Sequence, residues 1–361
     1  MTKTVLVGLS GGVDSTVAAI LLKEKGYNVI GATMAIWGNR EIKGMALKSG
    51  HKDACFSPNE KEDIDAARKI AEEIGIDYHV FDCTQQYEEI VLKYFKNEYL
   101  KGRTPNPCIW CNALVKFGAL PYVARLNGLE FDYFATGHYA RVEKGENRYL
   151  LKRGIMPKKD QSYFLYKLTQ DQLKEIMLPL GGYKKEEIRE LARKYGLTVA
   201  DKPDSQDFYD GDYNDLLGIQ DKIGNIVDLG GNVLGQHKGI WNYTVGQRKG
   251  LGISSTEPLY VLSLNKDKNE VVVGPLDKTF KKSLIAKNIN LVSFEKIEDS
   301  FKAKAKIRST QEPQDVTVEK IDDDTVKITF DEYQKSIAIG QSAVVYIDDI
   351  LVLGGIIDSV E

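Results

Sequence analysis

The sequence predicts an α/β domain built on a parallel sheet, followed by a small β-rich unit and a C-terminal β-barrel. Up to about Ala200, short β-branched runs alternate with amphipathic helical stretches, as in a parallel sheet covered by helices. Beyond about Asp204 the chain changes to glycine-rich turns and short alternating strands. A chain of 361 residues is also long enough for two or three separate cores.

Each element of the first domain has a local signal. The expected strands are Thr4–Leu9, Asn28–Met34, Tyr78–Phe81 and Phe131–Thr136. Helical spacing of apolar residues predicts helices over Asp63–Glu73, ended by Gly75, and over Lys185–Tyr195, ended by Gly196. The expected domains are 1–203, 204–281 and 282–361.

Composition and charge limit the classes of function that are compatible with the sequence. The chain is 42% hydrophobic and 28% charged, which is ordinary for a globular protein, and we expect no membrane span and no signal peptide. We therefore expect a cytoplasmic protein. The net charge of −3 gives no overall basic signature, so any nucleic-acid contact must use local basic patches. Four cysteines in a chain this long do not form a secreted disulfide framework.

A glycine-rich turn follows the first strand. The segment Ser10-Gly11-Gly12-Val13-Asp14-Ser15 lies between that strand and an apolar helix, where free N–H groups and the helix dipole favour a polyanion. It lacks the Gly-Lys-Ser/Thr ending of a Walker A loop and the G-x-G-x-x-G spacing of a dinucleotide-binding fold. The serine hydroxyls are expected to donate to phosphates, and Asp14 to act through Mg²⁺ or by orienting the loop.

A second motif, GRTPNPCIWCN, spans residues 102–112 and contains a C-x-x-C. Its two prolines keep the backbone before the cysteines extended. Cys108 and Cys111 are therefore expected at a loop-to-helix junction, where a thiolate is stabilised and exposed. In a reducing compartment this spacing indicates metal or redox chemistry. The alternatives are a zinc knuckle, which lacks a second ligand pair here, and two incidental core cysteines.

These motifs resemble those of known enzymes. SGGVDS resembles the loop of the N-type ATP pyrophosphatases, which transfer AMP to an oxygen and release pyrophosphate. Almost the whole chain closely resembles the tRNA-uridine 2-sulfurtransferases, or tRNA 2-thiouridylases, of the MnmA family. The motifs that carry this second resemblance are GLSGGVDS (8–15), GRTPNPxxxCN (102–112), ATGHYAR (135–141), KDQSYFLY (159–166), TVGQRKGLGI (244–253) and GQSAVVY (340–346).

The resemblance implies a fold and a reaction. The fold is an adenine nucleotide alpha hydrolase-like pyrophosphatase domain with a parallel sheet, a central tRNA-binding domain and a C-terminal β-barrel. The reaction is ATP-dependent 2-thiolation of the wobble uridine of tRNA: the C2 carbonyl oxygen is adenylated, and sulfur then replaces it with release of AMP. The implied cofactors are ATP and Mg²⁺. The partners are tRNA and a sulfur donor, which is sulfide, a cysteine desulfurase or a relay protein.

The resemblance also assigns roles to matching positions. Cys111 matches the catalytic nucleophile, with Cys108 and Asp14 beside it in the expected catalytic set. The implied nucleotide-binding residues are Gly8, Leu9, Ser10, Gly11, Gly12, Val13, Asp14, Ser15, Met34 and Gly137. The implied tRNA-binding residues are Asn106, His138, Asp160, Gln161, Ser162, Arg308, Ser309 and Gln341. Further basic residues expected to bind RNA are Lys101, Arg103, Lys159, Arg248 and Lys249.

One position departs from the family pattern. Family members carry a second cysteine in a DSxxxC segment, and Tyr209 stands there in this chain. Cys108 and Cys111 are therefore expected to act as a persulfide and resolving pair, or to bind a [4Fe–4S] cluster together with Cys55. Cys83 is a second candidate for the third ligand, although burial is its more common fate.

Two other functions are compatible with parts of the sequence. A small-molecule ligase or amidotransferase of the same loop class is disfavoured by the C-x-x-C and by the basic strand FKAKAKIRS, residues 301–309. A non-catalytic tRNA-binding relic is disfavoured because both principal motifs are intact.

Overall fold

The computed structural model describes residues 2–38, 54–201, 208–209 and 213–361. The chain forms two compact units. Unit 1 comprises 1–92, 107–212 and 349–351, and unit 2 comprises 93–106, 213–348 and 352–361. No helix among the described residues is both long enough and apolar enough to cross a membrane.

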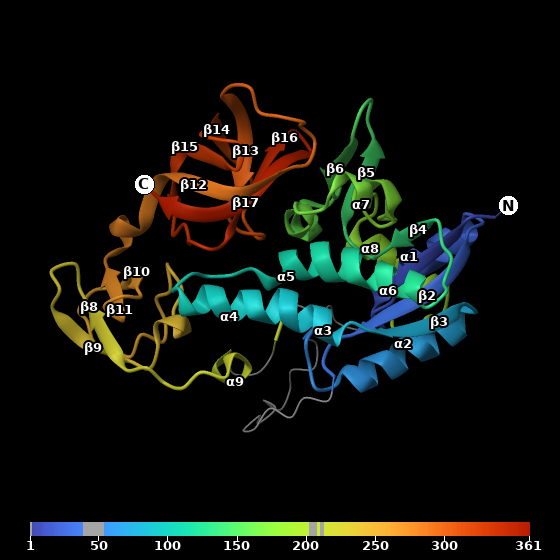
Figure 1. Ribbon diagram of the computed structural model, residues 1–361, viewed down its shortest axis with the longest axis horizontal. Coiled ribbons are helices and arrows are strands. Elements are labelled where there is room, and N and C mark those ends of the chain that lie inside the picture. The colour runs from blue at the N-terminus through green and yellow to red at the C-terminus, as the bar shows by residue number, and fades with distance from the viewer. Residues whose placement is uncertain (1, 39–53, 202–207, 210–212) are drawn as a thin grey trace. The chain divides into compact units, whose positions relative to one another are not determined.

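Unit 1 is built on a parallel sheet with the strand order β3-β2-β1-β4-β7 (Figure 1). Its strands are β1 (Thr4–Gly8), β2 (Asn28–Ala35), β3 (Asp77–Asp82), β4 (Tyr133–Ala135) and β7 (Ile176–Met177). The central strand β1 pairs with β2 on one side and with β4 on the other. The carboxyl ends of these strands therefore meet at one edge, at the point where the chain crosses from one side of β1 to the other. The predicted parallel sheet is confirmed.

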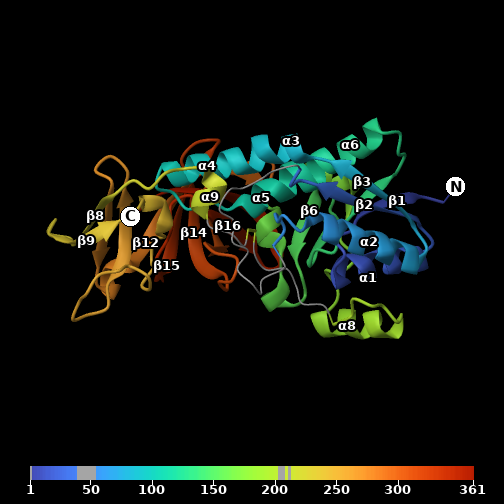
Figure 2. The same ribbon diagram turned by 90° about the horizontal axis from the view of Figure 1, so that it is seen from below.

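Helices cover both faces of this sheet. The helices α1 (Val13–Glu24) and α2 (Glu60–Ile74) lie on one face, and α8 (Lys185–Lys194) lies on the far side of α1 (Figure 2). Buried Val5, Val7 and Val29 of the sheet pack with Ala19 and Leu22 of α1. On the other face lie α3 (Thr84–Tyr87), the π-helical segments η1 (Glu88–Leu92) and η2 (Cys111–Ala119), and α6 (Leu120–Leu126).

The helix ends follow the expected glycine signals. Gly75 ends α2 with a φ of 64°, in the left-handed region that favours glycine, and Gly196 follows α8 with a φ of 68°. Both predicted helices are confirmed. The other elements of unit 1 are α5 (Pro107–Trp110), β5 (Ala140–Lys144), β6 (Tyr149–Arg153), α7 (Gln170–Glu175) and the 3₁₀ turns η3 (Pro157–Lys159) and η4 (Ser162–Leu165).

Unit 2 contains a small sheet and a closed barrel. The small sheet has the order β10-β11-β8-β9. The barrel has the order β12-β15-β14-β13-β16-β17, and pairing of β12 with β17 closes it. Closure leaves no free strand edge, which protects the sheet from pairing with other chains. The predicted β-rich middle and C-terminal barrel are confirmed, while the predicted boundary between 281 and 282 stays a prediction.

The elements of unit 2 have the following bounds. The helical segments are α4 (Lys93–Leu100), α9 (Tyr213–Leu217), η5 (Ile240–Asn242) and η6 (Leu276–Thr279). The small sheet consists of β8 (Gly224–Val227), β9 (Val233–His237), β10 (Tyr260–Asn265) and β11 (Glu270–Gly274). The barrel strands are β12 (Phe280–Leu291), β13 (Phe301–Lys306), β14 (Gln314–Lys320), β15 (Thr325–Lys335), β16 (Ser342–Ile347) and β17 (Ile350–Val360).

Candidate active site

The glycine-rich turn lies at the carboxyl edge of the sheet, between β1 and α1. Gly11 has a φ of 72°, and Gly12 is the N-cap of α1 without a side-chain hydrogen bond to the helix. The first N–H groups of α1 are thus available to a ligand, as an anion site requires. Ser15 Oγ accepts from Ser10 N and lies 3.2 Å from Ser10 Oγ, so the two serines brace the turn. Ser10 itself is exposed.

Asp14, in the first turn of α1, is held by two residues from distant parts of unit 1. Lys185 Nζ donates to both Asp14 carboxylate oxygens at 2.8 Å, and Tyr139 Oη donates to Oδ1 at 2.7 Å. A carboxylate engaged in this way is not a free Mg²⁺ ligand. Of the two expected roles of Asp14, orientation of the loop is therefore the one that the geometry favours. No sequence motif indicated Lys185, because it lies 171 residues from Asp14.

Gly137 and His138 join the phosphate loop to the helix that carries the cysteines. A Cβ at Gly137 would lie 2.8 Å from Ser15 N, so only glycine fits against the loop. His138 follows, with Nδ1 2.7 Å from Thr136 Oγ1 and its ring centroid 5.6 Å from that of Phe117 in η2. Burial, and then the nearby Lys116 ammonium, hold the pKa of His138 well below 6.5, so the ring is neutral near pH 7.

The C-x-x-C lies at a helical start, as predicted, because Cys108 is in α5 and Cys111 begins η2. The predicted stabilised thiolate is wrong for this structure. Both cysteines keep only part of their surface exposed. Burial raises the pKa of Cys108 to about 12 and that of Cys111 to about 11, and the nearby Lys116 ammonium opposes both increases. Both groups are therefore thiols near pH 7.

Cys55 lies beside the segment in which Tyr209 occurs. Phe56 N donates to Phe208 O at 3.0 Å, and the Phe56 ring centroid lies 6.1 Å from that of buried Tyr209. Cys55 is exposed and influences the pKa of both Cys108 and Cys111. The fold thus brings a thiol near the place where the family's second cysteine is expected.

Among the residues that the structure describes, the cysteines are not arranged as a metal site. Within the described ranges, no group of three or more His, Cys, Asp or Glu side chains is placed to hold a metal ion. Cys83 is fully buried, and burial raises its pKa to about 11. The cluster ligand set Cys55, Cys108 and Cys111 therefore stays a prediction, and we derive no chemical step from it.

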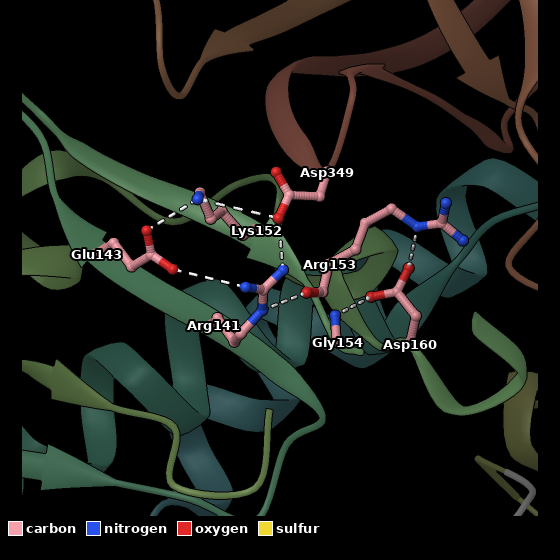
Figure 3. A network of polar contacts seen from close by, with 7 residues as sticks. All are labelled: Arg141, Glu143, Lys152, Arg153, Gly154, Asp160 and Asp349. Atoms are coloured by element: carbon pink, nitrogen blue, oxygen red, sulfur yellow. Dashed lines mark hydrogen bonds and ion pairs between the residues drawn. The ribbon is translucent and has the colours of Figure 1, made fainter. Parts of the chain in front are cut away.

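Asp160 belongs to a buried polar network at the hairpin β5–β6 (Figure 3). Its Oδ1 accepts from Gly154 N and Ser162 N, both at 3.1 Å, and its Oδ2 accepts from Arg153 Nε at 3.2 Å. The Gln161 side chain accepts from Tyr139 N at 2.9 Å. Asp160 and Ser162 are buried. The geometry favours a supporting role for these side chains, and their contact with tRNA stays a prediction.

The same network extends to β5, which carries Arg141 and Glu143. Arg141 Nη2 contacts Asp349, and Arg141 Nε donates to Arg153 O at 2.9 Å (Figure 3). Lys152 Nζ lies 2.8 Å from a Glu143 oxygen. The alternating charges fix the β5–β6 hairpin beside residues 349–351.

In unit 2, the residues predicted to bind tRNA have varied surroundings. Gln341 Nε2 donates to Thr104 O and Pro105 O at 3.1 Å, so it supports the segment that carries partly exposed Asn106. Arg308 is exposed and donates to Ser336 O at 2.9 Å, while Ser309 is partly exposed. Their role in tRNA binding stays a prediction.

Two expectations about basic residues need correction. Arg103 is not a free cation, because its guanidinium pairs with Glu98 at 2.7 Å and with Asp358 at 3.1 Å. Most of the charge on the basic strand at 301–309 is also neutralised or buried. Lys302 pairs with Asp331, Lys304 pairs with Asp315, and Lys306 is 1% exposed. The three lysines of that strand are therefore no argument for RNA binding. Arg248 and Lys249 are exposed, and Lys159 is partly exposed.

Comparison with known proteins covers nearly the whole chain. Family models match residues 3–209 (tRNA methyl transferase HUP domain), 217–275 (tRNA methyl transferase PRC-barrel domain) and 281–357 (Aminomethyltransferase beta-barrel domain). A tRNA-specific 2-thiouridylase MnmA of Endomicrobium trichonymphae is 48% identical over 98% of this chain and 98% of its own length.

A second relative, the tRNA-specific 2-thiouridylase MnmA of Clostridioides difficile (strain 630), is 46% identical over 99% of both chains. Among solved structures, a 4-thiouridine synthetase–RNA complex with bound ATP is 17% identical, with a TM-score of 0.34, over 56% of this chain and 43% of that chain. That likeness is too low to place residues. The full-length matches at nearly half identity are decisive, and the chain belongs to the MnmA family of tRNA-specific 2-thiouridylases.

Proposed function

We propose that this protein is an ATP-dependent tRNA 2-thiouridylase. It adenylates the C2 carbonyl oxygen of the wobble uridine with release of pyrophosphate, and sulfur then displaces AMP. The observation that carries this proposal is the connection of the phosphate loop to the cysteine-bearing helix. Gly137 contacts the loop, and the adjacent His138 packs against η2, which begins at Cys111.

The loop residues have separate tasks in this proposal. The exposed Ser10 hydroxyl and the N–H groups at the start of α1 bind the phosphates, while Lys185 and Tyr139 hold Asp14 as part of the loop. Mg²⁺ would be held mainly by the ATP phosphates, where it neutralises charge on the leaving pyrophosphate. Met34, near the end of β2 and partly exposed, is proposed to line the adenosine site.

Sulfur transfer through the Cys108/Cys111 pair balances in atoms and electrons. The Cys111 thiolate attacks the outer sulfur of a donor persulfide, which leaves as a thiol, so that Cys111 carries a persulfide. The terminal sulfur of this persulfide attacks C2 and expels AMP, which leaves a tRNA–S–S–Cys111 disulfide. The Cys108 thiolate then attacks the Cys111 sulfur, releases the thiolated tRNA and leaves a Cys108–Cys111 disulfide. A dithiol reductant must reset the pair. Because both resting cysteines are thiols, each must lose a proton before it can react.

This chemistry implies the partners of the protein and its cellular compartment. The substrate tRNA is proposed to contact Asn106, His138, Arg308, Ser309 and the exposed basic residues Arg248 and Lys249. For this persulfide route the sulfur donor is a cysteine desulfurase or a relay protein that carries sulfane sulfur, because sulfide cannot convert a resting thiol into a persulfide without a two-electron oxidant. The cytoplasm, where such partners occur, is the proposed compartment.

Nucleoside mass spectrometry of tRNA tests the proposal. A strain that lacks the gene should lose 2-thiouridine, and the wild-type gene should restore it while Cys111→Ser should not. An unchanged nucleoside profile in the deletion strain would contradict the thiolase and favour a small-molecule ligase. Restoration by Cys111→Ser would exclude Cys111 as the sulfur carrier.

A further inference from the structure

Two lysines of the barrel in unit 2 have no acidic partner. Lys282 lies in β12 and Lys335 is the last residue of β15, and both are exposed. Among the residues that the structure describes, neither lysine forms an ion pair or a side-chain hydrogen bond. The exposed lysines of β13 differ, because Lys302 and Lys304 each pair with an aspartate. The positive charge that the barrel offers to a ligand therefore lies on β12 and β15.

Aromatic rings hold both of these ammonium groups. Lys282 Nζ lies 5.7 Å from the ring centroid of Tyr333, and Lys335 Nζ lies 5.1 Å from that of Tyr260 in β10. An aromatic ring attracts an ammonium group without neutralising its charge. Tyr333 is 63% exposed, so much of its ring also remains accessible. Oriented cations and an exposed ring thus occur together.

These side chains share one face of the barrel. Along β15, Tyr333 and Lys335 are exposed on either side of buried Gln334, as the alternation of side chains in a strand requires. Phe280 of β12 lies directly opposite Lys335, and opposite residues of an antiparallel pair project to the same face. We call Phe280, Lys282, Tyr333 and Lys335 the lysine–aromatic surface.

The lysine–aromatic surface adjoins residues that are already proposed to contact tRNA. Ser336 follows Lys335, and its main-chain oxygen accepts from Arg308 Nη2 at 2.9 Å. A Cβ at Gly246 would lie 2.4 Å from Ser336 Oγ, so the loop that carries the basic residues 248–249 packs against the end of β15. The basic loop, Arg308 and the lysine–aromatic surface are therefore continuous within unit 2.

We propose that the lysine–aromatic surface binds the phosphate backbone of the substrate tRNA and extends the contact made by Arg308 and the basic loop. This inference rests on the proposed function, because it adds a further part to the tRNA-binding surface. Lysines without a protein counterion neutralise phosphates, and an exposed ring can stack on an unpaired base. An acidic protein would pair with the lysines alone, whereas exposed Tyr333 favours a ligand that offers both phosphates and bases.

Filter binding of the full-length protein to tRNA over a range of salt concentrations tests this surface. Lys282→Gln/Lys335→Gln should reduce the slope of log affinity against log salt by about 1.5 to 2, and should weaken binding about tenfold at about 0.1 M salt. Lys302→Gln/Lys304→Gln is the matched control, because it removes the same charge from exposed lysines of the same barrel that are paired. It should change the slope by less than about 0.5. Thermal unfolding checks that each variant is folded.

Equal losses of affinity in the two double variants would overturn the proposal, because the overall charge would then determine tRNA binding. A wild-type slope and affinity in Lys282→Gln/Lys335→Gln would overturn it as well. If that variant binds tRNA normally but no longer accepts sulfur from a protein donor, the surface belongs to an acidic protein partner and the proposal is wrong. Each of these results leaves the proposed function intact, whereas failure of the wild-type protein to bind tRNA would refute both.

Discussion

Replacement of Lys185 by methionine should weaken ATP binding, because it leaves the Asp14 carboxylate without its cation beside the phosphate loop. The Lys185 side chain is 7% exposed and that of Asp14 is 29% exposed, so water compensates only in part. With a separation of roughly 6 Å and an effective dielectric constant of about 20, the repulsion between Asp14 and one phosphate charge is about 3 kcal/mol. After allowance for the exposed part of Asp14, we expect the Kd for ATP to rise about tenfold to thirtyfold.

Calorimetric titration with ATP and Mg²⁺ measures this change, and thermal unfolding checks the fold. Loss of the charged hydrogen bonds should also lower the free energy of unfolding by roughly 1–3 kcal/mol. The double variant Asp14→Asn/Lys185→Met removes both charges, so its Kd should return to within about threefold of wild type. If the double variant binds ATP no better than Lys185→Met, then Lys185 acts on the nucleotide directly and not through Asp14.

Four further outcomes are expected. Ser10→Ala should abolish thiolation and leave the affinity for tRNA, measured by filter binding, nearly unchanged. A parallel loss of tRNA binding would contradict the expectation that ATP and tRNA bind at separate surfaces. The affinity for tRNA should fall steeply with salt, and Arg248→Ala/Lys249→Ala should reduce the salt slope by about 2, whereas an unaltered slope would remove these residues from the interface. If the cluster prediction holds, protein purified without oxygen contains iron and sulfide and Cys55→Ala loses both; iron-free, active protein would exclude it. The lowered pKa of His138 means that stability is present above about pH 6.5 and falls as the pH decreases, so His138→Gln should reduce this loss in unfolding titrations.

Local sequence signals identified most of the secondary structure and the two principal motifs. Alternating apolar runs located β1, β2 and β3 to within a residue or two, because strand periodicity is a property of neighbouring residues. The turn at 10–15 was identifiable because glycine, hydroxyl and carboxyl groups follow a strand in a fixed order. The C-x-x-C was found in the same way, by spacing alone.

The environment of each motif was decided by the tertiary structure. The predicted thiolates are thiols, because partial burial of Cys108 and Cys111 raises the pKa of both groups, and burial is not encoded in a four-residue spacing. Asp160 lies in a motif that resembles a tRNA contact, yet its carboxylate is enclosed by Gly154, Ser162 and Arg153.

By itself, then, the sequence determined the order of elements, the phosphate loop, the cysteine pair and the family. Only the tertiary structure paired Asp14 with Lys185, neutralised Lys302 and Lys304, and placed the ammonium of Lys335 over the ring of Tyr260. Periodicity and motifs record interactions between residues a few positions apart, whereas these contacts join residues that only the folded backbone brings together. The charge available to a ligand depends on such distant partners, because each ion pair or hydrogen bond removes a group that the sequence alone presents as free.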